Sequence, residues 1–130
     1  MKEQCRIQLK KFKDSTTKLS EVLKRNIQDD DIILDATIQR FEFTYENAWK
    51  AIKQVLRFTG DDCISPRDCI KKAYKYGWIT EEDLFLELLD CRNLTSHTYN
   101  LNIAMKVYKI IKKNHFLFQN LHDKLEEVMK

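Results

Sequence analysis

The chain has 130 residues, the length of one domain, and a chain of this size buries roughly two thirds of its unfolded surface. Apolar residues make up 43% and charged residues 33% of the sequence, which argues against a disordered chain. Two glycines and one proline supply few turns, so the composition favours long helices over sheets. The net charge of +3 permits a nucleic-acid partner but does not indicate one.

The four cysteines form no Cys-x-x-Cys pair and show no zinc-type spacing with the histidines. We interpret Cys5, Cys63, Cys69 and Cys91 as reduced thiols, as in a cytoplasmic protein. The opening segment MKEQCRIQLKKF has no apolar core typical of a secretory signal. No apolar run reaches the length of about 18 residues that suggests a membrane span. The sequence therefore predicts a single cytoplasmic domain over residues 1–130, with no membrane association, no metal site and no cofactor.

The first predicted helix runs from Lys2 to about Asn26. Its apolar stripe, which recurs at steps of four and three residues, consists of Cys5, Leu9, Phe12, Thr16, Leu19 and Leu23. The acidic run from Asp29 to Asp31 then supplies capping oxygens and negative charge for the next helix. Capping is favoured over metal binding, because three adjacent carboxylates cannot all point at one ion from a helix start.

The second predicted helix is the longest and extends from about Asp31 to Thr59, with Gly60 as its stop. Its stripe keeps the same rhythm through Leu34, Ile38, Phe41, Tyr45, Ala48, Ile52 and Val55. Phe43 and Trp49 fall outside this stripe. They either widen the buried face or mark a surface for a partner, and the sequence leaves both interpretations open.

Three further helices follow, and capping residues predict where they start. Ser65 with Pro66 begins a short helix that ends before Gly77, and Thr80 begins a helix that reaches Arg92. Asn102 is the predicted cap of the last helix, whose stripe consists of Ala104, Val107, Ile111, Phe118, Leu121, Leu125 and Val128. The pattern predicts an all-α, antiparallel up-and-down bundle of four main helices and one short helix.

The segment CRNLTSHTYN, residues 91–100, collects ionisable and hydrogen-bonding side chains at the end of a helix. On a continuous helix Arg92 and His97 would point about 140° apart, whereas Arg92 and Ser96 would share a face. Thr, Ser and Asn compete for backbone hydrogen bonds, so we expect unwinding near Thr95. Arginine and histidine could then converge, either within one chain or across two copies.

Such a pair suits cleavage of an RNA phosphodiester by the substrate's own 2′-hydroxyl. His97 would move protons and Arg92 would stabilise phosphate charge, with Asn93 and Ser96 in support and the Tyr99 phenol nearby. The alternative is an ordinary helix C-terminus, where the helix dipole also favours Arg and His. The spacing of these two residues alone favours that alternative.

Three blocks of the sequence resemble one known family. RNLTSHTY resembles the R-x4-H-x-Y motif of HEPN-domain proteins. The three blocks are DATIQRFEFTYENAWKAIKQVL (35–56), SPRDCIKKAYKYGWI (65–79) and LLDCRNLTSHTYN (88–100), the last of which contains this motif. They are most similar to HepT toxins and nucleotidyltransferase substrate-binding proteins, two overlapping groups. The resemblance covers residues 35–108, while the terminal helices match in pattern more than in letters.

The resemblance implies a HEPN-like homodimer in which two copies of the motif face one another across a cleft. Arg92 and His97 match the catalytic positions of a metal-independent endoribonuclease, and Asn93 matches a polar position beside them. Tyr99 matches the tyrosine that a partner nucleotidyltransferase, the MntA-type antitoxin, adenylylates to stop RNA cleavage. Some members of the family are described only as non-catalytic substrate-binding subunits of a nucleotidyltransferase, and that alternative stays open.

Two other groups of charged side chains allow more than one interpretation. Arg67, Lys71 and Lys72 could follow an RNA backbone or form an ordinary charged surface. Glu42 and Glu46 lie one helical turn apart on the second helix. We expect them to pair with Arg40 and Lys50 rather than to bind a metal.

The remaining aromatic and imidazole rings are expected to pack. Trp49 and Trp78 are interpreted as packing residues rather than as platforms for bases. His115 and His122, near Phe118 on the last helix, are interpreted as packing or rim residues.

Overall fold

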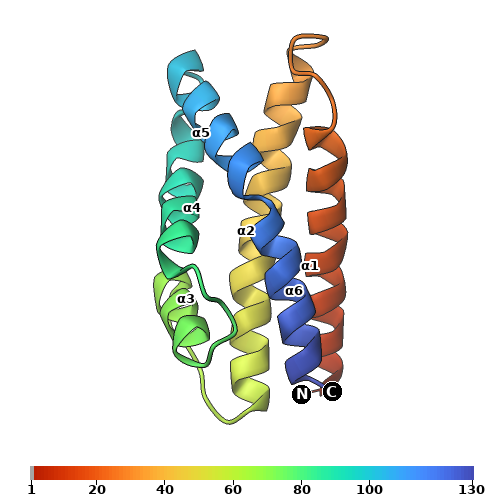
Figure 1. Cartoon of the computed structure of the whole chain (residues 1–130), viewed down its shortest axis with the longest axis vertical. Coiled ribbons are helices and arrows are strands. Elements are labelled where there is room, and N and C mark those ends of the chain that lie inside the picture. The colour runs from red at the N-terminus through yellow and green to blue at the C-terminus, as the bar shows by residue number, and fades with distance from the viewer. Residues whose placement is uncertain (1) are drawn as a thin grey trace.

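The computed structural model describes residues 2–130, which form six α-helices and one short 3-10 helix, without a strand. The elements are α1 (Lys2–Leu23), α2 (Ile32–Phe58), α3 (Pro66–Lys75), α4 (Glu82–Leu94), η1 (Thr95–His97), α5 (Leu101–Asn114) and α6 (Phe116–Val128). Figure 1 shows an elongated bundle in which the two chain ends meet at the end opposite the α1–α2 loop. The all-α prediction is confirmed. No helix within residues 2–130 has the length and apolarity needed to cross a membrane.

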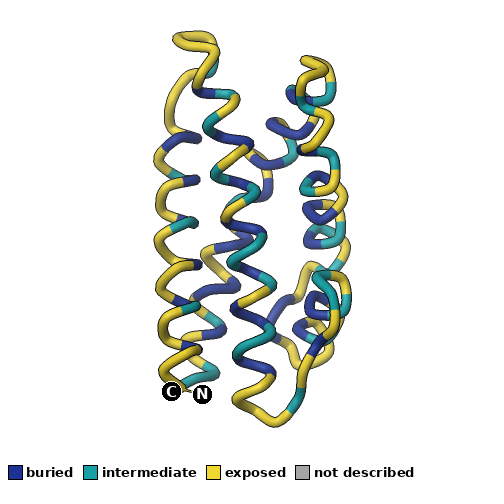
Figure 2. Tube along the Cα trace, turned by 180° about the vertical axis from the view of Figure 1, so that it is seen from behind, coloured by how far each residue is buried: buried dark blue, intermediate teal, exposed yellow. Residues whose placement is uncertain are grey.

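Helix α2 is the centre of the bundle, because it contacts each of the other five α-helices. The predicted stripes of α1 and α2 form the core, and Figure 2 shows buried residues turned inward along both helices. Thr16 and Thr37 are buried polar residues in these helices, and each donates its hydroxyl to the carbonyl four residues earlier. Because these hydroxyls are satisfied, they can be buried without the cost of an unpaired polar group.

An aromatic cluster around Phe118 of α6 joins four helices in the core. The Phe118 ring lies edge-on to Phe12, Tyr45 and Phe85 at centroid distances of 6.4, 6.1 and 6.3 Å. It is tilted against Phe41 at 6.2 Å. All five rings are at most 1% exposed. Aromatic pairs in these orientations stabilise a core beyond their buried area, so this cluster fixes α6 against α1, α2 and α4.

Several helix boundaries follow the predicted turn chemistry. An oxygen of Asp30 accepts the backbone N–H two residues later at 3.0 Å, and Ser65 accepts the one three residues later at 3.1 Å. Pro66 occupies the first position of α3. Gly60 and Gly77 have φ of +95° and +76°, a region that favours glycine, and each follows a helix end.

Two predicted caps are wrong. The Thr80 hydroxyl donates to the Glu81 carboxylate, and Glu81, at the start of α4, makes no capping hydrogen bond with its side chain. Helix α5 is capped by Asn100, not by Asn102. The side-chain oxygen of Asn100 accepts from the backbone N–H groups of Asn102 and Ile103 at 2.9 and 3.3 Å. Asn100 has the extended backbone that a capping residue needs, so helix α5 starts before the predicted cap.

The predicted single last helix is divided into α5 and α6 at His115, so the bundle has one more helix than expected. The side chain of Asn114 donates to the Ile110 carbonyl at 3.0 Å, and the backbone N–H of Phe118 bonds to the His115 carbonyl in a tighter turn. A side chain that enters the backbone ladder and a tightened turn are known causes of bends. The bend lets α5 pack on α4 while α6 packs on α1 (Figure 1).

The cysteines differ from the prediction of four reduced thiols. Cys63 and Cys69 form a disulfide with their Cα atoms 5.0 Å apart, a separation typical of such bonds, while Cys5 and Cys91 are free and buried. Cys63 precedes α3 and Cys69 lies in its first half, six residues later. The Cys-x-x-Cys pattern does not predict a bond at this spacing.

Candidate functional site

The predicted site residues lie where the chain passes from α4 to α5, at the end of the molecule away from the two chain ends (Figure 1). Helix α4 stops at Leu94 and the 3-10 helix covers Thr95–His97, which confirms the predicted unwinding near Thr95. The Thr95 hydroxyl donates to the Arg92 carbonyl at 2.7 Å, and the Thr98 hydroxyl donates to the Thr95 carbonyl at 2.9 Å. These side-chain bonds satisfy carbonyls that the ending helix leaves free.

His97 and Tyr99 project from this turn into solvent. Their ring centroids are 6.2 Å apart with the rings steeply inclined to each other, and Tyr99 is 87% exposed. The His97 carbonyl accepts the backbone N–H of Asn100 at 3.1 Å, which closes the turn before α5 begins. Both side chains are therefore held on an ordered backbone and are accessible to another molecule.

Arg92 is fixed by a carboxylate on the central helix. Its Nε and Nη2 atoms lie 3.2 and 3.1 Å from one oxygen of Glu46, whose second oxygen accepts from the indole N–H of Trp49 at 3.1 Å. Arg92 and Glu46 are both about one third exposed. Trp49 thus orients Glu46, and Glu46 orients the guanidinium while leaving its other edge available.

The pairing expected for Glu46 is wrong. Arg40 donates instead to the backbone carbonyl of Lys18 at 2.8 Å, and the Lys50 ammonium lies 6.0 Å from the centroid of the Trp49 ring. Glu46 is the site residue that sequence reasoning missed. The available signal was its position three residues before Trp49, which places both side chains on one face of α2 outside the main stripe.

The described chain does not join the predicted site residues into one constellation. No hydrogen bond connects Arg92 with His97 among residues 2–130, since the guanidinium turns to α2 and the imidazole projects from the turn. Asn93 and Ser96 are exposed, and the Ser96 hydroxyl reaches the Asn93 carbonyl only at 3.5 Å. A composite site would require a second molecule.

A surface hollow of about 510 Å³ lies between the first half of α2 and the α4–α5 turn. Thr98 lines it from the turn, and Ile32, Gln39 and Glu42 are among the residues that line it from α2. The hollow therefore lies directly beside the candidate site.

The predicted basic strip on α3 is partly neutralised by carboxylates. Lys72 pairs with Asp61 at 3.1 Å and Arg67 lies 4.0 Å from Asp90, while Lys71 is exposed. Hydrogen bonds from the Tyr76 hydroxyl, the backbone and Lys72 lower the pKa of Asp61 to about 2, and the Asp61 partner raises the pKa of Lys72. These local pairs reduce the net positive charge on the surface of α3.

Metal-ligand geometry is absent from the part of the chain that the structure describes. Residues 2–130 contain no group of three or more His, Cys, Asp and Glu side chains arranged to hold an ion. The acidic run before α2 caps that helix through Asp30, in agreement with its interpretation as a cap.

Comparison with protein families decides the relationship. A family described as "Nucleotidyltransferase substrate binding protein like" matches residues 7–127, nearly the whole chain. The chain belongs to this family. The match includes all three sequence blocks on which the resemblance was based, so the predicted family is confirmed.

Individual relatives agree with the family and the fold. The chain is 32% identical over 103 residues to a Haemophilus influenzae protein named "Probable ribonuclease HepT", covering 72% of this chain and 70% of that protein. A crystal structure of a Thermus thermophilus protein matches with a TM-score of 0.80 and 31% identity, over 88% of this chain and 98% of that chain. A Haemophilus influenzae structure described as the fold of a nucleotidyltransferase substrate-binding domain matches with a TM-score of 0.68 and 24% identity, over 97% and 99% of the chains.

Proposed function

We propose that this member of the family is a HepT-type toxin, a metal-independent endoribonuclease that acts as a homodimer and is neutralised by a partner nucleotidyltransferase. The observation that carries the proposal is the α4–α5 turn, which presents His97 and Tyr99 to solvent on an ordered backbone, beside an arginine fixed by Glu46. The 32% identity to a protein named as a ribonuclease supports the same class of activity.

Arg92 is the group that would bind the scissile phosphate. A guanidinium has five N–H donors, and the pair with Glu46 uses only the edge formed by Nε and Nη2. The opposite edge remains to contact phosphate oxygens, on which negative charge increases in the transition state. Because Glu46 holds the side chain in place, little conformational entropy is lost when the phosphate binds.

His97 is the group that would move protons. It would take the proton from the 2′-hydroxyl as that oxygen attacks phosphorus, and it would return a proton to the 5′-oxygen as the P–O bond breaks. The products would be an RNA fragment with a 2′,3′-cyclic phosphate and one with a free 5′-hydroxyl. Every bond that changes belongs to the RNA, so the step needs only a base and an acid from the protein.

The experiment that tests this activity is incubation of the purified protein with RNA in excess chelator. We expect cleavage that continues in chelator and leaves cyclic phosphate ends. Intact RNA after incubation with folded protein would contradict the ribonuclease proposal.

The homodimer is proposed from exposed apolar side chains beside the site. Ile32 and Phe43 are 65% and 56% exposed, and their spacing of eleven residues places them on one face of α2, together with Glu46. Leu101, at the start of α5, is 66% exposed. A second copy covering this face would bury these residues and bring two α4–α5 turns toward each other, which would complete the cleft that one chain lacks.

We predict that Phe43→Glu converts the dimer into a monomer, because a carboxylate in an apolar interface loses its hydration without gaining a partner. Analytical ultracentrifugation should show a dimer dissociation constant raised at least ~30-fold, as for a central interface residue. Phe58→Glu is the matched control, since Phe58 is 41% exposed on the same helix but at its far end. A dimer unaffected by Phe43→Glu would show that the interface lies elsewhere.

Regulation is proposed to occur at Tyr99, whose hydroxyl the partner, an MntA-type nucleotidyltransferase, would adenylylate. With 87% of its surface exposed, Tyr99 can enter another enzyme's active site without unfolding of the turn. The attached phosphate and nucleoside would place bulk and negative charge beside His97, where RNA must bind. The modification would therefore block access to the site.

We predict that Tyr99→Phe removes the mass increase of one adenylyl group that mass spectrometry should detect after incubation with the partner and ATP. The same variant should retain RNA cleavage and remain toxic when co-expressed with the partner, whereas the wild-type protein is neutralised. Tyr74→Phe is the control, because Tyr74 is a 49% exposed tyrosine on α3. An unchanged adenylyl signal in Tyr99→Phe would assign the modification to another residue.

A second candidate function is a non-catalytic subunit that presents a substrate to the nucleotidyltransferase. The family description over residues 7–127 favours this alternative. It predicts that the protein co-purifies with the partner, is tolerated by cells when expressed alone, and leaves RNA intact. Toxicity on expression alone, relieved by co-expression of the partner, would separate the toxin from the subunit.

A further inference from the structure

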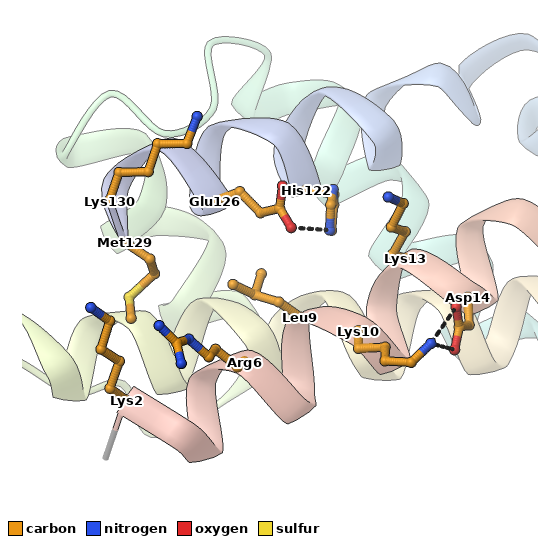
Figure 3. Close-up of a pocket in the computed structure, with 10 residues that line it drawn as sticks. All are labelled: Lys2, Arg6, Leu9, Lys10, Lys13, Asp14, His122, Glu126, Met129 and Lys130. Atoms are coloured by element: carbon orange, nitrogen blue, oxygen red, sulfur yellow. Dashed lines mark hydrogen bonds and ion pairs between the residues drawn. The ribbon is translucent and has the colours of Figure 1, made fainter.

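A second concave surface lies at the opposite end of the bundle from the α4–α5 turn. It is a pocket of about 710 Å³ between α1 and α6, close to where the two chain ends meet. Figure 3 shows side chains of α1 on one wall and, on the other, side chains of α6 and of Met129 and Lys130, which follow it, with Leu9 between the walls. Pockets of about 300–1,000 Å³ are the size that small organic ligands occupy.

The rim of this pocket is strongly basic. Among its lining residues, two carboxylates, Asp14 and Glu126, face five cationic side chains, namely Lys2, Arg6, Lys10, Lys13 and Lys130. Lys10 is directed along α1 to Asp14, 3.2 Å away, so this pair neutralises itself (Figure 3). The remaining cations outnumber Glu126, so the pocket carries an excess of positive charge that favours an anion.

His122 supplies a buried polar group that has no hydrogen-bond partner. The residue is 1% exposed and lines the pocket, and its Nε2 atom forms no hydrogen bond with any described residue. An oxygen of Glu126 lies 3.6 Å from Nε2, which is an ion-pair contact (dashed in Figure 3) but too long for a hydrogen bond. The other ring nitrogen, Nδ1, lies 3.2 Å from Asp123, and the Phe12 ring packs edge-on against the imidazole at 5.9 Å.

An unpaired nitrogen in a core side chain is costly, because it loses its hydrogen bonds to water without replacing them. The imidazole is fixed by Asp123 on one side and Phe12 on another, so Nε2 cannot turn toward solvent. A ligand in the pocket would satisfy it, either by donating a hydroxyl to Nε2 or by accepting from it through a phosphate oxygen.

We propose that the α1–α6 pocket binds a small organic phosphate of about mononucleotide size. The phosphate lies at the basic rim, where the Arg6 guanidinium binds its oxygens. The organic part lies against the apolar side chains of Leu9 and Met129, and His122 Nε2 hydrogen-bonds to the ligand. This site shares no lining residue with the candidate ribonuclease site.

The test is calorimetric titration of the full chain with 5′-AMP as the probe, beside adenosine and inorganic phosphate. We expect 5′-AMP to bind, and both of the other compounds to bind at least ~10-fold more weakly, since each lacks one part of the recognised structure. Equal binding of inorganic phosphate would show a site for an anion only and would overturn the proposal. Equal binding of adenosine would overturn the role of the basic rim.

Variants locate the binding in this pocket. Arg6→Gln should weaken 5′-AMP binding about tenfold, as expected for a lost charge-assisted contact. Lys11→Gln removes the same charge from an exposed residue of α1 that does not line the pocket, and it should leave the affinity unchanged. His97→Ala should also leave it unchanged, because His97 belongs to the other end of the molecule. Equal losses in Arg6→Gln and Lys11→Gln would reveal non-specific charge attraction and contradict the site.

The contact between His122 and the ligand can be tested in the wild-type protein, without a variant whose folding must first be checked. The imidazole resonances of His122 in the NMR spectrum of the wild-type protein should shift on addition of 5′-AMP, while those of His97 stay in place. His122→Phe keeps a ring against Phe12 and removes Nε2, and it should weaken binding about fivefold or more. A short RNA that binds through Arg6 and His122 when 5′-AMP does not would overturn the small-ligand proposal.

Discussion

His97→Ala should reduce RNA cleavage about a thousandfold, within the range by which a positioned general acid–base group accelerates proton transfer. The substitution removes the only imidazole at the α4–α5 turn, where its ring lies against that of Tyr99. The fold should remain intact, because the side chain is exposed and contributes nothing to the core. The measurement is the initial rate of cleavage of a labelled RNA in excess chelator.

The control for this experiment is His115→Ala, which removes an imidazole from the bend between α5 and α6, far from the turn in sequence. Its cleavage rate should equal that of the wild-type protein. Circular dichroism of both variants should show the same helix content. Cleavage that continues at the wild-type rate in His97→Ala would assign the activity to another site or to a contaminating nuclease.

The fold was predictable where a physical rule acts within one helix. The α2 stripe through Ile38 and Phe41 predicted which face is buried, because buried residues recur along a helix with the helical period of about 3.6 residues. The choice between Asn100 and Asn102 as a cap could not be made this way. Both residues have the same capping chemistry, and only the extended backbone of Asn100 decides between them.

The bend at His115 and the disulfide were missed for related reasons. A polar residue within an apolar stripe only interrupts the pattern. The sequence does not reveal that the Asn114 amide donates a hydrogen bond to the Ile110 carbonyl. The Cys63–Cys69 bond joins one cysteine before α3 to one within it, six residues later, a spacing that the Cys-x-x-Cys pattern does not include.

The candidate site was predictable only in its local part. Arg92 and His97 were found from one short segment, and the unwinding near Thr95 followed from the residues themselves. Glu46 was not found, because it precedes Arg92 by 46 residues and meets it only when α2 packs on α4. The pocket between α1 and α6 is likewise a tertiary feature. The sequence predicted that His122 packs or lies at a rim, and only the assembled bundle shows that its Nε2 atom lacks a hydrogen-bond partner.

Phe118→Ala should lower the free energy of unfolding by about 4 kcal/mol, the usual cost of removing a large buried aromatic ring. Phe118 is fully buried and its ring contacts aromatic residues from α1, α2 and α4, so no neighbour can fill the space without moving a helix. Domains of this size are stable by only about 5–15 kcal/mol. The loss would therefore be a large fraction of the total, measurable by urea unfolding monitored by circular dichroism.

Phe116→Ala is the matched control, because Phe116 lies two residues earlier on α6 and is 48% exposed. The same side chain is removed from the same helix, but much of its surface already contacts water, so the loss should stay below about 1 kcal/mol. The difference between the two variants isolates the aromatic cluster from any general effect on helix α6. A loss under about 1.5 kcal/mol for Phe118→Ala, where cavity formation predicts far more, would mean that the bundle closes around the missing ring and that α6 is not fixed by it.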